Sequence, residues 1–297
     1  MTELAYFDHP LAIIDVVGPD AASFLHNLTT NDVKSMVPGD SRELFLTNHK
    51  ARVLGHGVVS CLAVDRFRLQ TDKSRGEAVF RHLNHYLISE QAELADRTAE
   101  FAACLLLGDG ADLIDCADVF RRSAFWGTPG TVLLYPISET ARVIGLLEAR
   151  GIPRGADAEL EIRRVEAGMP KFGAEMDETR FVVEVDRIAQ AISYAKGCYL
   201  GQEPIVMARD RGQVNRRLLG LRVAGDNPVS PGTKLMSGDV EVGAVTSSVH
   251  SARFGCVLCL AYLRRGHQEP GTTLTIAGEG EGDGRAATIS SLPFAVV

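Results

Sequence analysis

Apolar residues in the first part of the chain alternate between strand-like runs and one-sided helical patterns. An apolar run over residues 11–17 ends at Gly18, and Asp20 can cap a helix that places Phe24 and Leu28 on one face. Apolar segments at 42–47, 52–59 and 66–71 predict three strands, and a further one-sided pattern predicts a helix from about residue 75. This part of the chain therefore mixes helices and strands.

The middle of the chain continues this mixture. We expect strands over residues 101–107 and 131–135 and helices over 111–120, 139–150 and 156–167, the last of them ended by Gly168 and Pro170. A doubly wound parallel sheet would show strict alternation of strands and helices. The irregular order favours an α+β fold.

After about residue 212 the pattern changes to short apolar segments separated by turns. The segments 218–223, 240–245, 256–262 and 272–276 are spaced by turn sequences rich in Gly, Pro, Asn and Asp. They predict a small antiparallel β-barrel. We therefore expect an α+β region over residues 1–212 and a C-terminal barrel over residues 213–297.

Composition limits the classes of partner. The 297 residues are 45% hydrophobic and carry a formal net charge of -7, so the protein can bury real cores but has no overall basic field for nucleic acid or anionic membranes. The longest apolar stretches are far shorter than the ~20 residues of a spanning helix, and the acidic start does not resemble a targeting peptide. We expect a cytoplasmic protein without direct nucleic-acid or membrane binding.

Several common kinds of site are not indicated. The sequence contains no G-x-S-x-G, Walker A or H-E-x-x-H motif. Cys61, Cys104 and Cys116 lie within or beside apolar runs, where cysteine usually packs in a core. Cys256 and Cys259 have C-x-x-C spacing, but no second pair completes a zinc site. We expect no metal centre.

One segment concentrates reactive and conformationally free residue types. Residues 196–203 read Lys-Gly-Cys-Tyr-Leu-Gly-Gln-Glu, with an ammonium, a thiol and two glycines. Glycines allow a backbone to approach a ligand closely, and an ammonium near a thiol favours the thiolate. The residues alone allow two interpretations: a loop that binds a ligand beside a reactive Cys198, or a turn with a packed cysteine.

This segment resembles the K-G-C-Y-x-G-Q-E signature of the YgfZ family, folate-binding proteins implicated in iron–sulphur cluster assembly or repair. The T-N-D-V at residues 30–33, the R-x-E-A-G at 164–168 and the basic stretch at 215–218 also resemble that family. These proteins are similar in fold to the glycine cleavage T-protein, a tetrahydrofolate-dependent aminomethyltransferase, and the resemblance extends along nearly the whole chain. It implies a multi-domain folate-binding α+β body, with two subdomains around a central cleft, closed by the barrel.

The resemblance also implies roles for individual residues. The candidate chemical residues are Cys198 and Lys196, and the other members of the motif loop are Gly197, Tyr199, Gly201, Gln202 and Glu203. The candidates for binding tetrahydrofolate, or a one-carbon-substituted folate, are Glu184, Asp72, Arg216 and Arg217.

Two of these folate assignments have a physical basis. A carboxylate such as Glu184 can accept paired N–H donors from the aminopyrimidine edge of a pterin, and arginines can bind the polyglutamate tail. The alternatives are a solvated acid on a strand for Glu184 and a solvated basic loop for Arg216 and Arg217. Asp72 occupies a place similar to that of a folate-contacting Asn in T-proteins.

One departure from the T-protein pattern concerns catalysis. T-proteins carry a pair of aspartates early in a strand, and the alignment puts Gly55 and His56 at those positions. The carboxylate of aminomethyl transfer is therefore missing there. An unperturbed histidine has a pKa near neutrality, so His56 could in principle move protons, although a single histidine in a strand is more often structural.

Three functional hypotheses follow. The first is a tetrahydrofolate-binding protein that supports iron–sulphur assembly in client enzymes, including tRNA-modifying ones, with Cys198 as the reactive thiolate. Because one cysteine cannot hold a stable cluster, client or assembly proteins would complete any such site. The second is a folate-dependent aminomethyltransferase or other one-carbon transferase. The third is a folate-sensing binding module in which Cys198 is structural.

Overall fold

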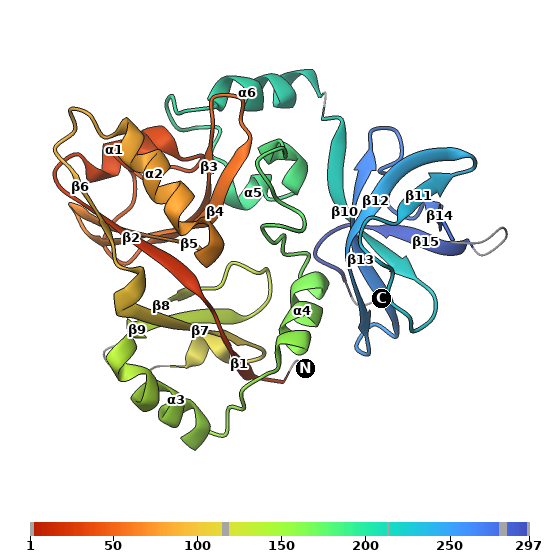
Figure 1. The fold of residues 1–297 in the computed structure, drawn as a ribbon, viewed down its shortest axis with the longest axis horizontal. Helices are drawn as coiled ribbons and strands as arrows, with labels where there is room; N and C mark the ends of the chain where they lie inside the picture. Colours follow the sequence, from red (N-terminus) through yellow and green to blue (C-terminus); the bar gives the residue numbers. More distant parts are fainter. Residues whose placement is uncertain (1–2, 115–118, 213, 279–283, 296–297) are drawn as a thin grey trace. The chain divides into compact units, whose positions relative to one another are not determined.

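The computed structural model describes residues 3–114, 119–212, 214–278 and 284–295 (Figure 1). The chain forms two compact units, one of Met1–Ala156 with Arg187–Val206 and the other of Asp157–Asp186 with Met207–Val297. The sequence places a boundary after residue 212, whereas residues 157–186 here group with the barrel.

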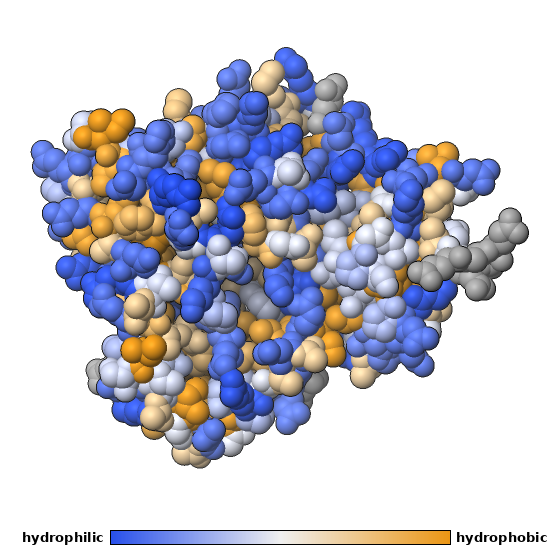
Figure 2. Space-filling model, viewed as in Figure 1, coloured by the Kyte–Doolittle hydropathy of each residue, from blue (hydrophilic) through white to orange (hydrophobic). Residues whose placement is uncertain are grey.

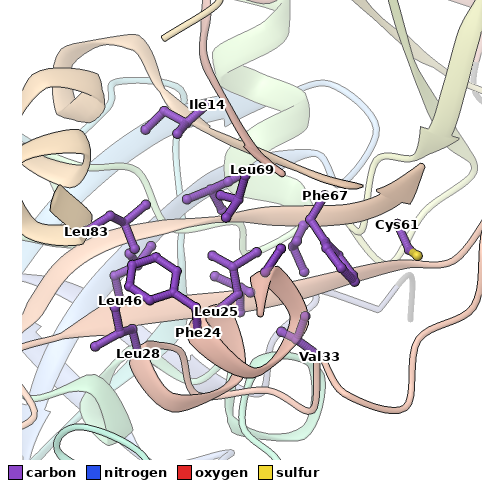
Figure 3. Packing of buried hydrophobic residues seen from close by; sticks show 14 of the residues in the cluster. Ile14, Phe24, Leu25, Leu28, Val33, Leu46, Cys61, Phe67, Leu69 and Leu83 are labelled. Atoms are coloured by element: carbon purple, nitrogen blue, oxygen red, sulfur yellow. The ribbon is translucent and has the colours of Figure 1, made fainter. Parts of the chain in front are cut away.

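The first unit contains a five-stranded antiparallel sheet in the order β3-β4-β5-β2-β6. Its strands are β2 (Leu11–Val17), β3 (Ser41–Thr47), β4 (Val53–Ala63), β5 (Arg66–Asp72) and β6 (Glu93–Asp96). Helices α1 (Ala21–Leu28) and α2 (Gly76–Tyr86) cover one face and bury their apolar sides against it. The resulting core includes Leu25, Leu46, Phe67, Leu69 and Leu83 (Figure 3).

A second antiparallel sheet of the same unit has the order β1-β7-β9-β8. Its strands are β1 (Ala5–Asp8), β7 (Phe101–Leu107), β8 (Phe120–Ser123) and β9 (Gly130–Pro136), and helix α3 (Thr140–Ala149) packs on one face. The predicted strands and the predicted helix at 139–150 are confirmed.

The predicted helix over residues 111–120 is wrong. The structure has a single 3₁₀ turn at Ala111–Leu113, and Phe120 already pairs with Leu134 of β9. Pairing at the sheet edge outweighs the local helical periodicity there. Residues 115–118 lie outside the described part of the chain.

The second unit holds a closed six-stranded barrel in the order β10-β13-β12-β11-β14-β15. The strands are β10 (Arg216–Val223), β11 (Lys234–Ser237), β12 (Val240–Ser251), β13 (Cys256–Arg264), β14 (Thr273–Ile276) and β15 (Arg285–Ser290). Helix α4 (Asp157–Glu166) packs on the outside of β12 and β13 through residues such as Val165. The predicted α+β fold with a C-terminal antiparallel barrel is confirmed. Strands β11 and β15 were not predicted, because they are short and about half of their residues are polar.

The surface drawn in Figure 2 is dominated by hydrophilic side chains, with hydrophobic residues in small groups. No helix among the described residues is long and apolar enough to cross a membrane. Cys61 and Cys104 are buried as predicted, and Cys116 lies outside the described residues.

Candidate functional site

Buried polar side chains lie on β3 and β5, on the face of the five-stranded sheet turned away from α1 and α2. Glu43 of β3, Val58 of β4 and Gln70 of β5 are paired neighbours across the three strands. Because Leu44 and Leu69 belong to the core under the helices, strand alternation turns Glu43 and Gln70 to the opposite face. Glu43 and Gln70 are each only 1% exposed. Such burial of polar groups requires partners.

Glu43 is held by two basic side chains. The Oε1 atom accepts hydrogen bonds from His56 Nε2 at 2.7 Å and from Arg187 Nε at 2.8 Å, and Arg187 Nη2 donates to Oε2. Burial alone would raise the pKa of Glu43, but the hydrogen bonds and charges of His56 and Arg187 outweigh it and lower the pKa to about 2. The carboxylate is therefore ionised at neutral pH.

The ionised carboxylate fixes the tautomer of His56. A carboxylate can only accept, so the proton on His56 must lie on Nε2. In the neutral imidazole Nδ1 then carries a lone pair and can accept a proton. The neighbouring Gly55 points the other way, where a Cβ would lie 2.7 Å from Val79 Cγ2 of α2. Of the two positions aligned with the T-protein acid pair, only position 56 reaches this face.

Arg187 also contacts the loop between β8 and β9 of the second sheet. Its Nη2 also donates to the carbonyl of Phe125 at 2.7 Å, and Phe125 has a φ of 59°, a left-handed conformation that non-glycine residues rarely adopt. Arg187 directly precedes α5 (Ile188–Ala191). Asn31 of the T-N-D-V segment ties this region to β3, since its Nδ2 donates to the carbonyls of Glu43 and Gln190 at 2.8 and 3.0 Å. That segment therefore positions the Glu43 site.

Lys196 of the motif loop binds backbone carbonyl groups at the C-terminal end of helix α1. Its ammonium donates to the backbone carbonyls of His26, Thr29 and Asn31 at 2.5, 2.6 and 2.8 Å. It also lies 4.6 Å from the centroid of the Tyr199 ring. Burial lowers the pKa of Lys196 to about 7. All three ammonium protons have acceptors in the backbone, so Lys196 anchors the loop, and its influence on the Cys198 thiol stays a prediction.

The two glycines of the motif differ in their surroundings. Gly201 has a φ of +83°, and a Cβ there would lie 2.6 Å from the Asn48 carbonyl oxygen and 2.7 Å from Thr47 Oγ1. Close packing on the β3–β4 hairpin therefore requires glycine at 201. A Cβ on Gly197, by contrast, would meet nothing within 4 Å. Gly197 and Cys198 are both exposed.

The rest of the motif leads into a helix. Tyr199 is buried, and among the described residues its hydroxyl has no hydrogen-bond partner. Gln202 and Glu203 begin α6 (Gln202–Arg211), within which the chain passes into the second unit. Pro204 is near the start of that helix, where a missing N–H is tolerated.

The predicted folate residues are divided between the units. In the first unit, Asp72 caps the 3₁₀ helix Lys73–Arg75 by accepting from Ser74 N at 2.8 Å. In the second unit, Glu184 lies on a 3₁₀ turn, Val182–Val185, and not on a strand. Its Oε2 accepts from the Phe181 amide at 3.4 Å.

The two arginines of the barrel entry behave differently. Both arginines are exposed, but Arg217 donates to Asp186 Oδ1 at 2.9 and 2.7 Å, and Asp186 directly follows the turn that carries Glu184. The R-x-E-A-G segment is structural: Arg164 is buried and donates to Ser247 Oγ of β12 at 2.7 Å, and Glu166 accepts from Ser251 Oγ at 2.5 Å.

Sequence reasoning missed the buried partners of His56. Glu43 reads as an ordinary polar position at the start of a strand, and Arg187 is 144 residues away from it. One sequence signal could have indicated the burial of Glu43. Glu43 alternates with core leucines along the strand, so its carboxylate lies on the opposite face of the sheet, which a second sheet can cover. Among the described residues, no group of three or more His, Cys, Asp or Glu is arranged to hold a metal ion.

Comparisons with known proteins agree on the fold. The family model for the GCVT N-terminal domain matches residues 3–114, and the model for the glycine cleavage T-protein C-terminal barrel domain matches residues 216–295. A probable aminomethyltransferase of Natronomonas pharaonis is 28% identical over 95% of this chain and 84% of that protein. An aminomethyltransferase of Mycobacterium leprae is 26% identical over 84% of this chain and 74% of that protein.

A solved structure extends this likeness to the whole chain. The crystal structure of glycine cleavage system aminomethyltransferase T from Bartonella henselae matches with a TM-score of 0.88 at 22% identity, covering 99% of this chain and 87% of that one. The chain therefore has the fold of the glycine cleavage T-protein family, with both the N-terminal domain and the C-terminal barrel of that family.

Proposed function

We propose that this protein binds tetrahydrofolate and uses it in the transfer of a one-carbon group. The fold and the aminomethyltransferase names of its relatives support this activity over the iron–sulphur role. The observation that carries the proposal is the buried Glu43–His56–Arg187 cluster, because it supplies a carboxylate and a proton acceptor where the T-protein acid pair is absent.

The second unit offers groups that fit the pterin of a folate. Glu184 is a half-buried carboxylate on a 3₁₀ turn, and a carboxylate can accept the N–H donors of an aminopyrimidine. In the same unit Arg180 stacks on the Tyr262 ring, 4.1 Å from its centroid, and its buried Nε has no hydrogen-bond partner among the described residues. A donor without an acceptor suits a ring nitrogen or oxygen. Bound tetrahydrofolate would supply the nucleophilic nitrogen that accepts the one-carbon group.

The first-unit cluster is suited to moving a proton. His56 Nδ1 accepts the proton, and the imidazolium formed is stabilised by Glu43, whose Oε1 already receives the Nε2 proton at 2.7 Å. Arg187 keeps Glu43 ionised and oriented through its paired contacts. In this proposal, His56, hydrogen-bonded to Glu43, takes the place of the catalytic carboxylate.

The activity is tested by tetrahydrofolate-dependent release of ammonia from an aminomethyl donor. We expect His56→Gln to reduce the rate about 100-fold or more, since general acid–base catalysis contributes roughly that much. His85→Gln, which changes an exposed histidine of α2, is the matched control and should keep the wild-type rate. Absence of folate-dependent ammonia release from the wild type, or an unaffected His56→Gln, would contradict the proposal.

A second candidate is the iron–sulphur role of YgfZ-type proteins, which the motif loop favours. Lys196 and Gly201 anchor both ends of the loop while Cys198 stays exposed, so a thiol is presented to solvent on a fixed backbone. A merely packed cysteine would be buried. Client enzymes, including tRNA-modifying ones, would be the partners.

This candidate is tested by replacing the gene with variants in its own host and assaying an iron–sulphur tRNA-modifying enzyme. Cys198→Ala should reduce that activity while keeping folate affinity, and Cys256→Ala, at another partly exposed thiol, should not. Full activity in Cys198→Ala would leave the folate-sensing module as the better account of the loop.

A further inference from the structure

A second buried guanidinium of the first unit lacks a counter-charge. Arg122 of β8 is 8% exposed, and its Nε donates to Gln70 Oε1 at 2.7 Å while its Nη1 donates to the Ser123 carbonyl at 2.8 Å. Within residues 3–114 and 119–212 no carboxylate forms an ion pair with it. Burial lowers the pKa of Arg122 to about 9, an effect that the charge of Glu43 partly opposes. Buried cations are normally paired, so this one is poised for an anion.

The amide of Gln70 offers a second donor without an acceptor. A guanidinium can only donate, so the oxygen of the amide must face Arg122 and the Nε2 group must face away. Gln70 is 1% exposed, and its Nε2 has no hydrogen-bond partner among the described residues. The amide and the guanidinium therefore present unused N–H groups from two different sheets of one unit.

Among Glu43, Arg187 and Arg122, one positive charge has no ion-pair partner in the described part of the chain. Glu43 balances Arg187, and Arg122 is left over. The half-buried His9 adds no charge, because burial and the field of Arg122 lower its pKa to about 3. Asp72, at the half-buried end of β5, is directed away as the cap of Lys73–Arg75, where it accepts from Ser74 N at 2.8 Å, and it forms no ion pair with Arg122 among the described residues. A single negative charge on planar oxygens would satisfy both the charge and the donors.

We propose that Arg122 and Gln70 form a binding subsite for a small monocarboxylate. One carboxylate oxygen accepts from the Arg122 guanidinium and the other from Gln70 Nε2. The subsite selects a carboxylate over a neutral amide by charge and over a dianionic phosphate because only one positive charge is uncompensated. Binding of the monocarboxylate does not depend on the proposed function.

Ligand binding at this subsite can be followed by the fluorescence of a nearby tryptophan. Trp126, its single tryptophan, is 8% exposed and lies four residues after Arg122, next to the Phe125 carbonyl that binds Arg187. Acetate, titrated at constant ionic strength against chloride, should change its fluorescence saturably in the wild type, and calorimetry should give the same affinity. Acetamide, the neutral isostere, should not bind.

Three variants make the test specific. Arg122→Met should weaken acetate binding about tenfold or more, the loss expected for a hydrogen bond to a charged group. Gln70→Glu places an internal carboxylate beside Arg122, so it should abolish acetate binding while raising the melting temperature. Arg121→Met removes the same charge from the exposed face of the same strand and should bind acetate as the wild type does.

Any of four results would overturn the subsite: no saturable acetate binding by the wild type, equal binding of acetamide, full binding by Gln70→Glu, or equal weakening by Arg121→Met. The Gln70→Glu arm keeps the test decisive if Arg122→Met does not fold. Titrating tetrahydrofolate into the same samples separates the two proposals. Acetate binding without folate binding would contradict the proposed function but not the carboxylate subsite. Folate binding without acetate binding would contradict the subsite but not the proposed function.

Discussion

At the scale of single residues, the buried carboxylate of Glu43 carries the largest energetic consequence. Glu43→Gln removes the counter-charge of Arg187, and leaving a buried charge unpaired typically costs about 3–5 kcal/mol. We therefore expect the free energy of unfolding at pH 7 to fall by about 3 kcal/mol, measured by urea denaturation. Glu139→Gln, which breaks an exposed pair with Arg142, should cost less than about 1 kcal/mol.

The same substitution has a pH signature. The folded state lowers the pKa of Glu43 from its ordinary value of 4.5 to about 2, so the unfolded state takes up the proton first as the pH falls. The stability that Glu43 contributes is complete above about pH 4.5 and is lost as the pH approaches 2. The stability gap between wild type and Glu43→Gln should be constant from pH 5 to 7 and shrink below that. A gap that stays constant down to pH 2 would contradict the ion pair.

Lys196 is expected to act on the backbone of its loop. Lys196→Met leaves three carbonyls without their donor, and each unsatisfied buried group costs about 1–3 kcal/mol. Amide hydrogen exchange over residues 193–201 should accelerate about tenfold or more, because the loop opens more readily. The exposed Lys50→Met serves as the control. Unchanged exchange in Lys196→Met would mean that the carbonyl contacts do not hold the loop.

At the scale of elements, the two glycines of the motif loop differ in the space around them and can be compared by substitution. Gly201→Ala must adopt a left-handed conformation and push a methyl group against the β3–β4 hairpin, so it should cost at least about 1–2 kcal/mol. Gly197→Ala meets nothing and should leave the unfolding free energy within about 0.5 kcal/mol of wild type. Denaturation curves of the two variants check both values. Equal destabilisation by both would contradict the described loop.

Amphipathic elements were the most predictable part of the structure. The helices at 21–28, 76–86 and 157–166 and the strands of the barrel core show their periodicity in the sequence. The short edge strand β8 was not predictable, since its four residues depend on pairing with β9 rather than on their own pattern. That strand carries Arg122, and because the strand was not predicted, the burial of this cation was not predicted either.

At the scale of the whole molecule, the resemblance of motifs predicted the T-protein fold, whereas the buried Glu43 cluster was not predictable from motifs. The K-G-C-Y-L-G-Q-E loop identified the region around Cys198, but Glu43, His56 and Arg187 meet only in the folded unit. Glu43 and His56 are 13 residues apart and sit on adjacent strands, whereas Arg187 reaches them from another segment entirely. Sequence spacing alone gives no sign of such a contact.

The central claim is that this protein is a tetrahydrofolate-binding member of its fold. Calorimetric titration of tetrahydrofolate under anaerobic, reducing conditions tests it most directly. We expect saturable binding to the wild type, weakened about tenfold or more in Glu184→Gln and unchanged in Glu178→Gln, which changes an exposed acid of the same unit. No binding to the wild-type protein would contradict the account.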